Sequence, residues 1–127
     1  MKFEPTPLAG AYLVHLEPRL DERGLFARAF CAREFAAQGL ETSFVQTNIS
    51  TNSRAGTMRG MHFQRAPDAE AKLVRSIKGA IYDVVVDMRE DSTTYLGWYG
   101  AEISDDNHLA MYVPKGFAHG YQALTDG

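Results

Sequence analysis

The sequence has almost no cysteine and no long apolar run. Cys31 is its single cysteine, so no disulfide can form within the chain. No stretch is long and apolar enough to span a bilayer, and the first residues carry no apolar core of a secretory signal. An unpaired thiol without an export signal is typical of a reducing compartment, and we therefore expect a cytoplasmic location.

Basic charge is also scarce. The 127 residues include 13 basic and 16 acidic side chains, which gives a formal net charge of −3. Proteins that bind nucleic acids generally have a basic excess, and electrostatic membrane anchors have basic clusters, so both classes are disfavoured. Hydrophobic residues make up 45% of the chain, which favours a folded protein over disorder, and the length fits one domain over residues 1–127.

Short segments of alternating apolar residues, separated by turn residues, dominate the chain. Their close spacing predicts an all-β fold, a sandwich or barrel of the jelly-roll kind. We expect strands at 12–16, 25–30, 44–49, 57–64, 72–77, 80–88, 97–104, 110–113 and 118–124. One short helix is expected from Ala32 to Gln38, with Gly39 after its C-terminus, and a hairpin turn is expected at Lys78-Gly79.

Polar side chains within the expected strands are the first indication of a site. One face of each strand of a small barrel points inward, and that face is normally apolar. Arg59 and His62 are separated by an odd number of residues, so a regular strand would point them to opposite faces. A bulge at Gly60 would return them to one face, and we expect one there. The polar strand residues are Gln46, Asn48, Arg59, His62, Lys72 and His119.

Each of these residues also has a structural interpretation. A single histidine in a strand is most often a surface or satisfied residue, which is our interpretation of His15 and His108. Lys72 alone would be solvated, and Arg59 alone could pair with a carboxylate such as Asp83. The number of polar residues in one expected barrel favours a site over these separate explanations.

A metal site is not expected. Residues 114–119, PKGFAH, have the P-x-G-x-x-H spacing of the second cupin motif, but metal-binding cupins also need an H-x-H pair and a downstream glutamate. Here that place is occupied by His62-Phe63-Gln64. Two histidines without carboxylate help are too few for a tight transition-metal site, so we expect neither a metal nor another cofactor.

Four segments together resemble the dTDP-4-dehydrorhamnose 3,5-epimerase family. They are LDERGLFARAF at 20–30, MRGMHFQ at 58–64, AKLVRSIKGAIYDVVVDMR at 71–89 and YVPKGFAHGYQAL at 112–124. The resemblance implies a cupin jelly roll without metal, usually a homodimer. It also implies action on a dTDP-linked 4-keto-6-deoxyhexose, which converts dTDP-4-dehydro-6-deoxyglucose to dTDP-4-dehydro-L-rhamnose in rhamnose biosynthesis.

The resemblance also implies roles for single residues. By motif match His62 is the general base, and Lys72 lies beside the 4-keto oxygen of the sugar. Substrate contacts are implied for Arg23 and Arg59 at the diphosphate, and for Gln46, Asn48 and His119 elsewhere. These roles fit the chemistry, because histidine titrates near working pH, an ammonium stabilises an enolate oxygen, and guanidinium forks suit diphosphate oxygens.

Two departures from the family pattern affect what we expect. Arg28 stands where many members have a glutamate that helps bind the substrate. Family members also continue beyond the FAHG segment with a general-acid tyrosine and, later, an aspartate that orients the base. We therefore expect residues 1–127 to be an N-terminal portion of an epimerase, better at proton exchange than at inversion.

Other functions remain open from the sequence. A one-carbon epimerase or a ketoisomerase of the same fold would use the same residues. A non-catalytic sugar-nucleotide-binding module would bind the ligand without exchanging its protons, and a metal-dependent cupin oxygenase would need a metal.

Overall fold

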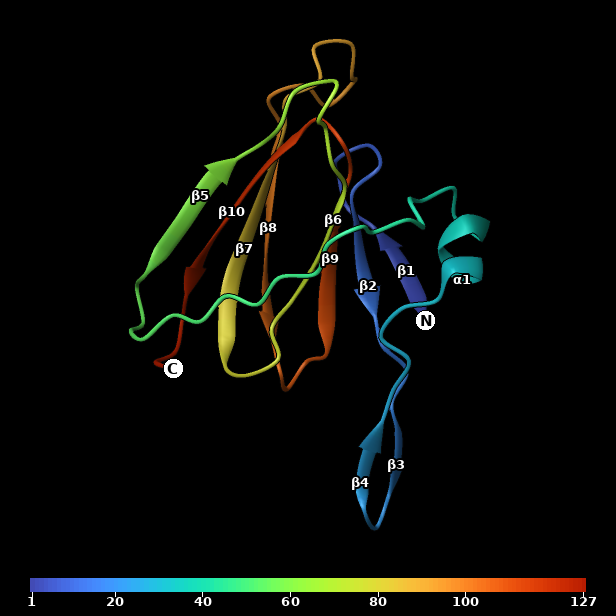
Figure 1. Cartoon of the computed structure of the whole chain (residues 1–127), viewed down its shortest axis with the longest axis vertical. Coiled ribbons are helices and arrows are strands. Elements are labelled where there is room, and N and C mark those ends of the chain that lie inside the picture. The colour runs from blue at the N-terminus through green and yellow to red at the C-terminus, as the bar shows by residue number, and fades with distance from the viewer.

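The computed structural model describes all 127 residues and contains two antiparallel four-stranded sheets packed face to face (Figure 1). The first sheet has the strand order β1-β2-β9-β6, the second has the order β5-β10-β7-β8, and β3 and β4 form a separate hairpin. This arrangement confirms the predicted all-β jelly-roll sandwich. The strands are β1 (Lys2–Pro5), β2 (Tyr12–His15), β3 (Arg19–Asp21), β4 (Gly24–Phe26), β5 (Met58–His62), β6 (Lys72–Arg75), β7 (Ala80–Asp87), β8 (Trp98–Ser104), β9 (Leu109–Val113) and β10 (Phe117–Ala123).

The apolar core lies between the two sheets. Its buried members come from inward-facing positions of both sheets, and they include Leu13, Val85, Ile103, Met111 and Phe117. The burial pattern of β7 alternates along the strand, as expected when one face of a strand packs on a core. The core therefore fixes which residues of each strand point inward.

The predicted helix is confirmed as α1 (Ala32–Ala37), and it covers the outer face of the first sheet. Phe35, which is completely buried, packs with Val14, Ala110 and Tyr112 in a second apolar cluster. The helix is neither long nor apolar enough to cross a membrane.

Two local predictions are wrong. The segment 44–49 forms no regular strand, although its residues alternate. None of the three sheets includes a strand from this segment; Phe44 packs beside the second apolar cluster, whereas Val45 and Ile49 are largely exposed. The turn at Lys78-Gly79 also closes no hairpin, because it carries the chain from β6 in the first sheet to β7 in the second.

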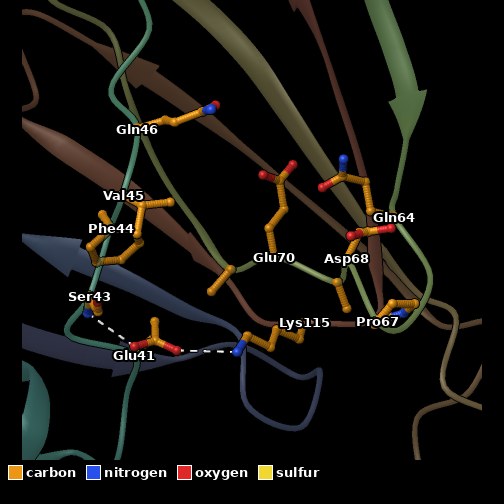
Figure 2. Close-up of a pocket in the computed structure, with 12 residues that line it drawn as sticks. Glu41, Ser43, Phe44, Val45, Gln46, Gln64, Pro67, Asp68, Glu70 and Lys115 are labelled. Atoms are coloured by element: carbon orange, nitrogen blue, oxygen red, sulfur yellow. Dashed lines mark hydrogen bonds and ion pairs between the residues drawn. The ribbon is translucent and has the colours of Figure 1, made fainter.

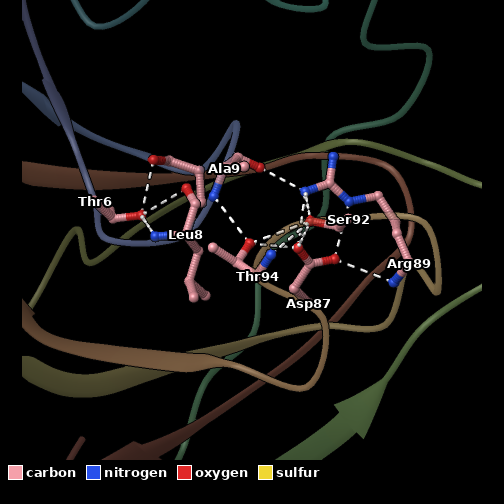
Figure 3. A network of polar contacts seen from close by, with 8 residues as sticks. Thr6, Leu8, Ala9, Asp87, Arg89, Ser92 and Thr94 are labelled. Carbon is pink, nitrogen blue, oxygen red and sulfur yellow. Dashed lines mark hydrogen bonds and ion pairs between the residues drawn. The ribbon is translucent and has the colours of Figure 1, made fainter.

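A polar network at the end of β7 ties the loop after that strand to the N-terminal segment (Figure 3). The buried carboxylate of Asp87 accepts hydrogen bonds from Arg89, Ser92 and Thr94. Arg89 also donates to the Ala9 carbonyl at 2.6 Å. Burial by itself would raise the pKa of Asp87, but the combined hydrogen bonds outweigh it and hold that pKa well below its usual range.

We expect Asp87→Asn to lower the free energy of unfolding by about 3 kcal/mol at pH 7, because it breaks a buried ion pair. The folded-state pKa of Asp87 is depressed, so its contribution is complete above about pH 4 and is lost as the pH falls further. Urea unfolding between pH 7 and pH 2.5 should therefore show a smaller loss of stability in the variant than in the wild type. Asp106→Asn, at an exposed position, is the control. Equal pH dependence of wild type and variant would contradict this account.

Candidate active site

The bulge predicted at Gly60 is confirmed by the pairing of β5 with β10. His62 pairs with His119 and Arg59 pairs with Tyr121, and the register shifts between the two pairs. Three steps along β5 thus match two steps along β10, which places one extra residue in β5. Gly60 has a φ of 109°, and a Cβ atom there would lie 2.6 Å from the Cα of Gly120. Glycine is therefore required at this point.

The bulge brings the polar residues of β5 onto the inner face of the second sheet. On β10, Phe117 belongs to the core, so His119 and Tyr121, at alternate positions, also face inward. Directly paired residues share a face, and so Arg59 and His62 face inward as well. His62 is exposed and makes no hydrogen bond within the chain, which leaves its imidazole free for a ligand.

Lys72 faces the same interior from the opposite sheet. It lies on β6 and pairs with Val113, a core residue, and Val74 two positions later packs on the same core. Its Nζ atom lies 3.4 Å from Oε1 of Glu70. The inner face thus carries an imidazole on one sheet and an ammonium on the other.

His119 has a buried carboxylate partner that the sequence did not indicate. Its Nε2 atom lies 2.7 Å from Oδ1 of Asp83 on β7. Burial raises the pKa of Asp83, and the hydrogen bond to His119 and the charge of Lys72 act against that rise. The suggested pairing of Asp83 with Arg59 is therefore wrong.

Arg59 is instead held by the segment before β5. Its Nε donates to Oδ1 of Asn52 at 2.8 Å, and its Nη2 donates to the Thr51 carbonyl at 3.3 Å. Asn52 also donates to the hydroxyl of Tyr121, which lies 2.8 Å from Oγ of Ser50. This network fixes one edge of the guanidinium and leaves its remaining N–H groups for an anion.

A cavity of about 470 Å³ adjoins this face (Figure 2). Gln46, Gln64 and Glu70 extend into it from the segment after α1 and from the loop that joins β5 to β6. Lys115 lines the cavity too and is paired with Glu41 at 3.3 Å. His62, Lys72 and His119 do not line the cavity. Glu70, which does line it, lies 3.4 Å from Nζ of Lys72 and so connects the cavity to the lysine. Asn48, two residues after Gln46, is exposed and makes no hydrogen bond within the chain.

Arg23 is not brought together with the other predicted residues. It lies at the tip of the β3–β4 hairpin, which extends away from both sheets, and it pairs with Asp21 at 2.6 Å (Figure 1). Arg28, which follows the hairpin, pairs with Glu34 of α1 at 2.7 Å. The Arg28 side chain is therefore engaged with the helix.

The arrangement combines a free imidazole, an ammonium and a partly held guanidinium. This set can remove a proton, stabilise the resulting oxyanion and bind a phosphate group. No three histidine, cysteine or carboxylate side chains gather closely enough to hold a metal ion. The sequence did not indicate the roles of Asp83 and Tyr121, because their partners His119 and Asn52 lie 36 and 69 positions away. It also did not indicate Asn52, which supports Arg59 from a segment without regular structure.

Comparisons with known proteins point to one family. A family model described as dTDP-4-dehydrorhamnose 3,5-epimerase matches residues 5–127. The chain is similar to the dTDP-4-dehydrorhamnose 3,5-epimerase of Methanothermobacter thermautotrophicus, with 46% identity over 98% of this chain and 66% of the relative. The chain thus spans slightly less than two thirds of the length of that relative.

Solved structures give the same result and agree with the cupin-like sandwich described above. The dTDP-4-dehydrorhamnose 3,5-epimerase of Bacillus anthracis, with TDP and PPi bound, superposes with a TM-score of 0.94 at 43% identity, over 98% of this chain and 71% of that one. The dTDP-6-deoxy-D-glucose-3,5-epimerase of Legionella pneumophila, in complex with dTDP-4-keto-L-rhamnose, superposes with a TM-score of 0.91 at 34% identity. The superposition covers 98% of this chain and 66% of the Legionella chain.

Proposed function

The chain belongs to the dTDP-4-dehydrorhamnose 3,5-epimerase family, and we propose that it takes part in the epimerisation of a dTDP-linked 4-keto-6-deoxyhexose. The proposed reaction converts dTDP-4-dehydro-6-deoxyglucose to dTDP-4-dehydro-L-rhamnose, a step of rhamnose biosynthesis in the cytoplasm. The observation that carries the proposal is the set of inward-facing residues: His62 opposite His119 on one sheet, and Lys72 on the other. The nucleotide and the keto sugar bound by the two structural relatives support the choice of ligand.

Proton removal next to the ketone is the proposed chemical step. His62 takes a proton from the carbon beside the carbonyl, and the electron pair of the broken C–H bond forms an enolate on the former ketone oxygen. Lys72 donates a hydrogen bond to that oxygen and stabilises its negative charge. The enolate is then reprotonated at the same carbon. Return of the proton by protonated His62 restores the original configuration, whereas a proton from water on the opposite face inverts it and His62 releases its own proton to the solvent.

Nucleotide binding is proposed for Arg59 and the segment that supports it. The free N–H groups of Arg59 bind the diphosphate, and the hydrogen bond from its Nε to Asn52 aims the guanidinium. Gln46 and Asn48 contact the substrate from the segment before β5. His119 contacts the sugar.

We expect Arg59→Ala to weaken dTDP binding by about 30-fold, because charge-assisted hydrogen bonds to phosphate oxygens are lost. The rate of proton exchange at saturating sugar nucleotide should change much less. Isothermal titration calorimetry with dTDP measures the affinity, and Arg54→Ala, an exposed arginine in the preceding turn, is the control. Unchanged affinity, or a loss confined to the saturated rate, would remove Arg59 from this role.

A homodimer is proposed from the β3–β4 hairpin. Leu20 and Phe26 on the hairpin are 76% and 75% exposed, which is unusual for large apolar side chains on an isolated surface. The hairpin also holds Arg23 away from the site of its own chain (Figure 1). Docking of the hairpin on a second copy would cover these side chains and bring Arg23 to the neighbour's site.

A dimer is therefore the expected result of light scattering at micromolar concentration. The double variant Leu20→Ser, Phe26→Ser should shift the chain to a monomer, because it removes apolar area from the proposed interface. Val45→Ser, at another highly exposed apolar position outside the hairpin, is the matched control. A monomeric wild type, or a double variant that stays dimeric, would contradict the proposed use of the hairpin.

The proposed reaction is tested by product analysis. Incubation with dTDP-4-keto-6-deoxyglucose, followed by NMR, identifies how many carbons have changed configuration. Inversion at both carbons beside the ketone supports the 3,5-epimerase assignment, whereas inversion at one indicates a one-carbon epimerase of the same fold. A moved carbonyl indicates a ketoisomerase. Binding without a change of configuration and without uptake of deuterium from deuterated water indicates a sugar-nucleotide-binding module.

A further inference from the structure

The buried carboxylate of Asp83 contacts His119 of the candidate site through one oxygen, and its other oxygen has no hydrogen-bond partner. Asp83 is completely buried, and its Oδ1 atom lies 2.7 Å from Nε2 of His119. Its other oxygen, Oδ2, is the one fully buried side-chain nitrogen or oxygen atom of the protein that has no hydrogen-bond partner. A carboxylate with so few bonds in an interior costs stability, so packing alone does not explain its presence.

Asp87 shows what a structural carboxylate looks like on the same strand. It lies four residues after Asp83 on β7, on the same inward face, and is also completely buried. Both of its oxygens accept hydrogen bonds, from the side chains of Arg89, Ser92 and Thr94. Asp83, in contrast, has a single bond, and that bond leads to a histidine of the candidate site.

The contact between Asp83 and His119 determines which ring nitrogen is left for a ligand. A carboxylate oxygen only accepts hydrogen bonds, so an ionised Asp83 requires the proton to reside on Nε2 of His119. The neutral ring then carries its lone pair on Nδ1, which makes no hydrogen bond within the chain. His119 is the direct strand partner of His62, so this lone pair lies in the same candidate site as the proposed base.

We propose that Asp83 is a positioning residue of the site: it holds His119 in the Nε2–H form, so that Nδ1 accepts a hydrogen bond from a hydroxyl group of the bound hexose. This inference rests on the function proposed above and adds to it a residue that does not itself touch the substrate. The Nδ1 lone pair of His119 can accept a hydrogen bond from a sugar hydroxyl group. It cannot bond to the ionised diphosphate, whose oxygens are acceptors only. The hydrogen-bond donors of the site, Arg59 and Lys72, serve the diphosphate and the enolate oxygen instead.

The histidine form is tested on the free chain, without any substrate. Long-range ¹⁵N–¹H spectra of the imidazole rings should show a ring proton on Nε2 of His119, visible because burial and the bond to Asp83 slow its exchange with water. The signal is assigned by its loss in His119→Gln, and it should also be lost in Asp83→Leu. A proton on Nδ1, or an Nε2 proton that persists in Asp83→Leu, would overturn the inference whatever the chain catalyses.

The contribution to sugar recognition is tested by comparing two ligands. Asp83→Leu should weaken binding of dTDP-glucose by about tenfold, the value of one hydrogen bond, while the affinity for dTDP changes by less than about twofold. Ile81→Ala, on the same strand and face but against the apolar core, should leave the ratio of the two affinities unchanged. Equal losses for both ligands in Asp83→Leu would make Asp83 merely structural and overturn the inference.

The test must still give a result if the Asp83 variant does not fold or if the wild-type chain binds no nucleotide. If Asp83→Leu does not fold, the smaller Asp83→Ala takes its place, because it also removes the acceptor of the Nε2–H bond, and the same selective loss of dTDP-glucose affinity is expected. If the wild type binds neither nucleotide, the proposed function fails, whereas the ring-proton spectrum still decides whether Asp83 holds His119 in the Nε2–H form.

Discussion

Replacing His62 with alanine is expected to slow proton exchange at the sugar ring by about 10³-fold or more, with little effect on dTDP affinity. The imidazole shares a face of its sheet with His119, is open to solvent and is bound to no other group of the chain, as a base awaiting a substrate should be. Alanine removes the group that takes the proton but leaves Arg59 and its support by Asn52 intact.

Exchange is measured by mass spectrometry of the sugar nucleotide after incubation in deuterated water. His15→Ala is the matched control, because His15 is a strand histidine that pairs with Glu4 at 2.6 Å on the first sheet, outside the site. Exchange at the wild-type rate in the His62 variant would rule out His62 as the base. A loss of dTDP affinity equal to the loss of rate would indicate a collapsed site.

Lys72→Ala is expected to lower the saturated rate of exchange by about 10² to 10³-fold, as the loss of one oxyanion donor does in other enzymes. Substrate affinity should fall much less, because the negative charge that the ammonium stabilises develops only during the reaction. Within the chain the ammonium is paired with Glu70, whose Oε1 atom lies 3.4 Å from Nζ.

The control for this variant is Lys115→Ala. Lys115 lies at the neighbouring cavity and pairs with Glu41, so its loss removes a positive charge nearby without touching the proposed enolate oxygen. The account predicts wild-type exchange in that control. A Lys72 variant that binds substrate weakly but exchanges protons normally at saturation would assign the lysine to binding instead.

Part of the site could be predicted because it follows local rules. The odd spacing of Arg59 and His62 around a glycine is enough to suggest a bulge, since strand alternation has a period of two. The structure contains that bulge, and the required positive φ at Gly60 explains why a glycine occupies the position.

The rest depends on contacts between distant segments, which local patterns do not encode. Residues 44–49 alternate like a strand, yet no partner strand lies beside them, because pairing is decided by the whole sheet. The partnership of Asp83 with His119 spans 36 positions and follows from the pairing of β7 with β10. The place of Arg23 depends on a hairpin that extends beyond the two sheets (Figure 1).

The central claim is that the polar end of this sandwich removes a proton beside a ketone. Its most direct test is to incubate the wild-type chain with dTDP-4-keto-6-deoxyglucose in deuterated water and to locate the incorporated deuterium by NMR. Exchange requires only a base and a stabilised enolate, so it reports on His62 and Lys72 without requiring inversion. The account predicts deuterium at the carbons next to the ketone and at no other ring position. Saturable binding of the sugar nucleotide with no deuterium at those carbons would contradict it.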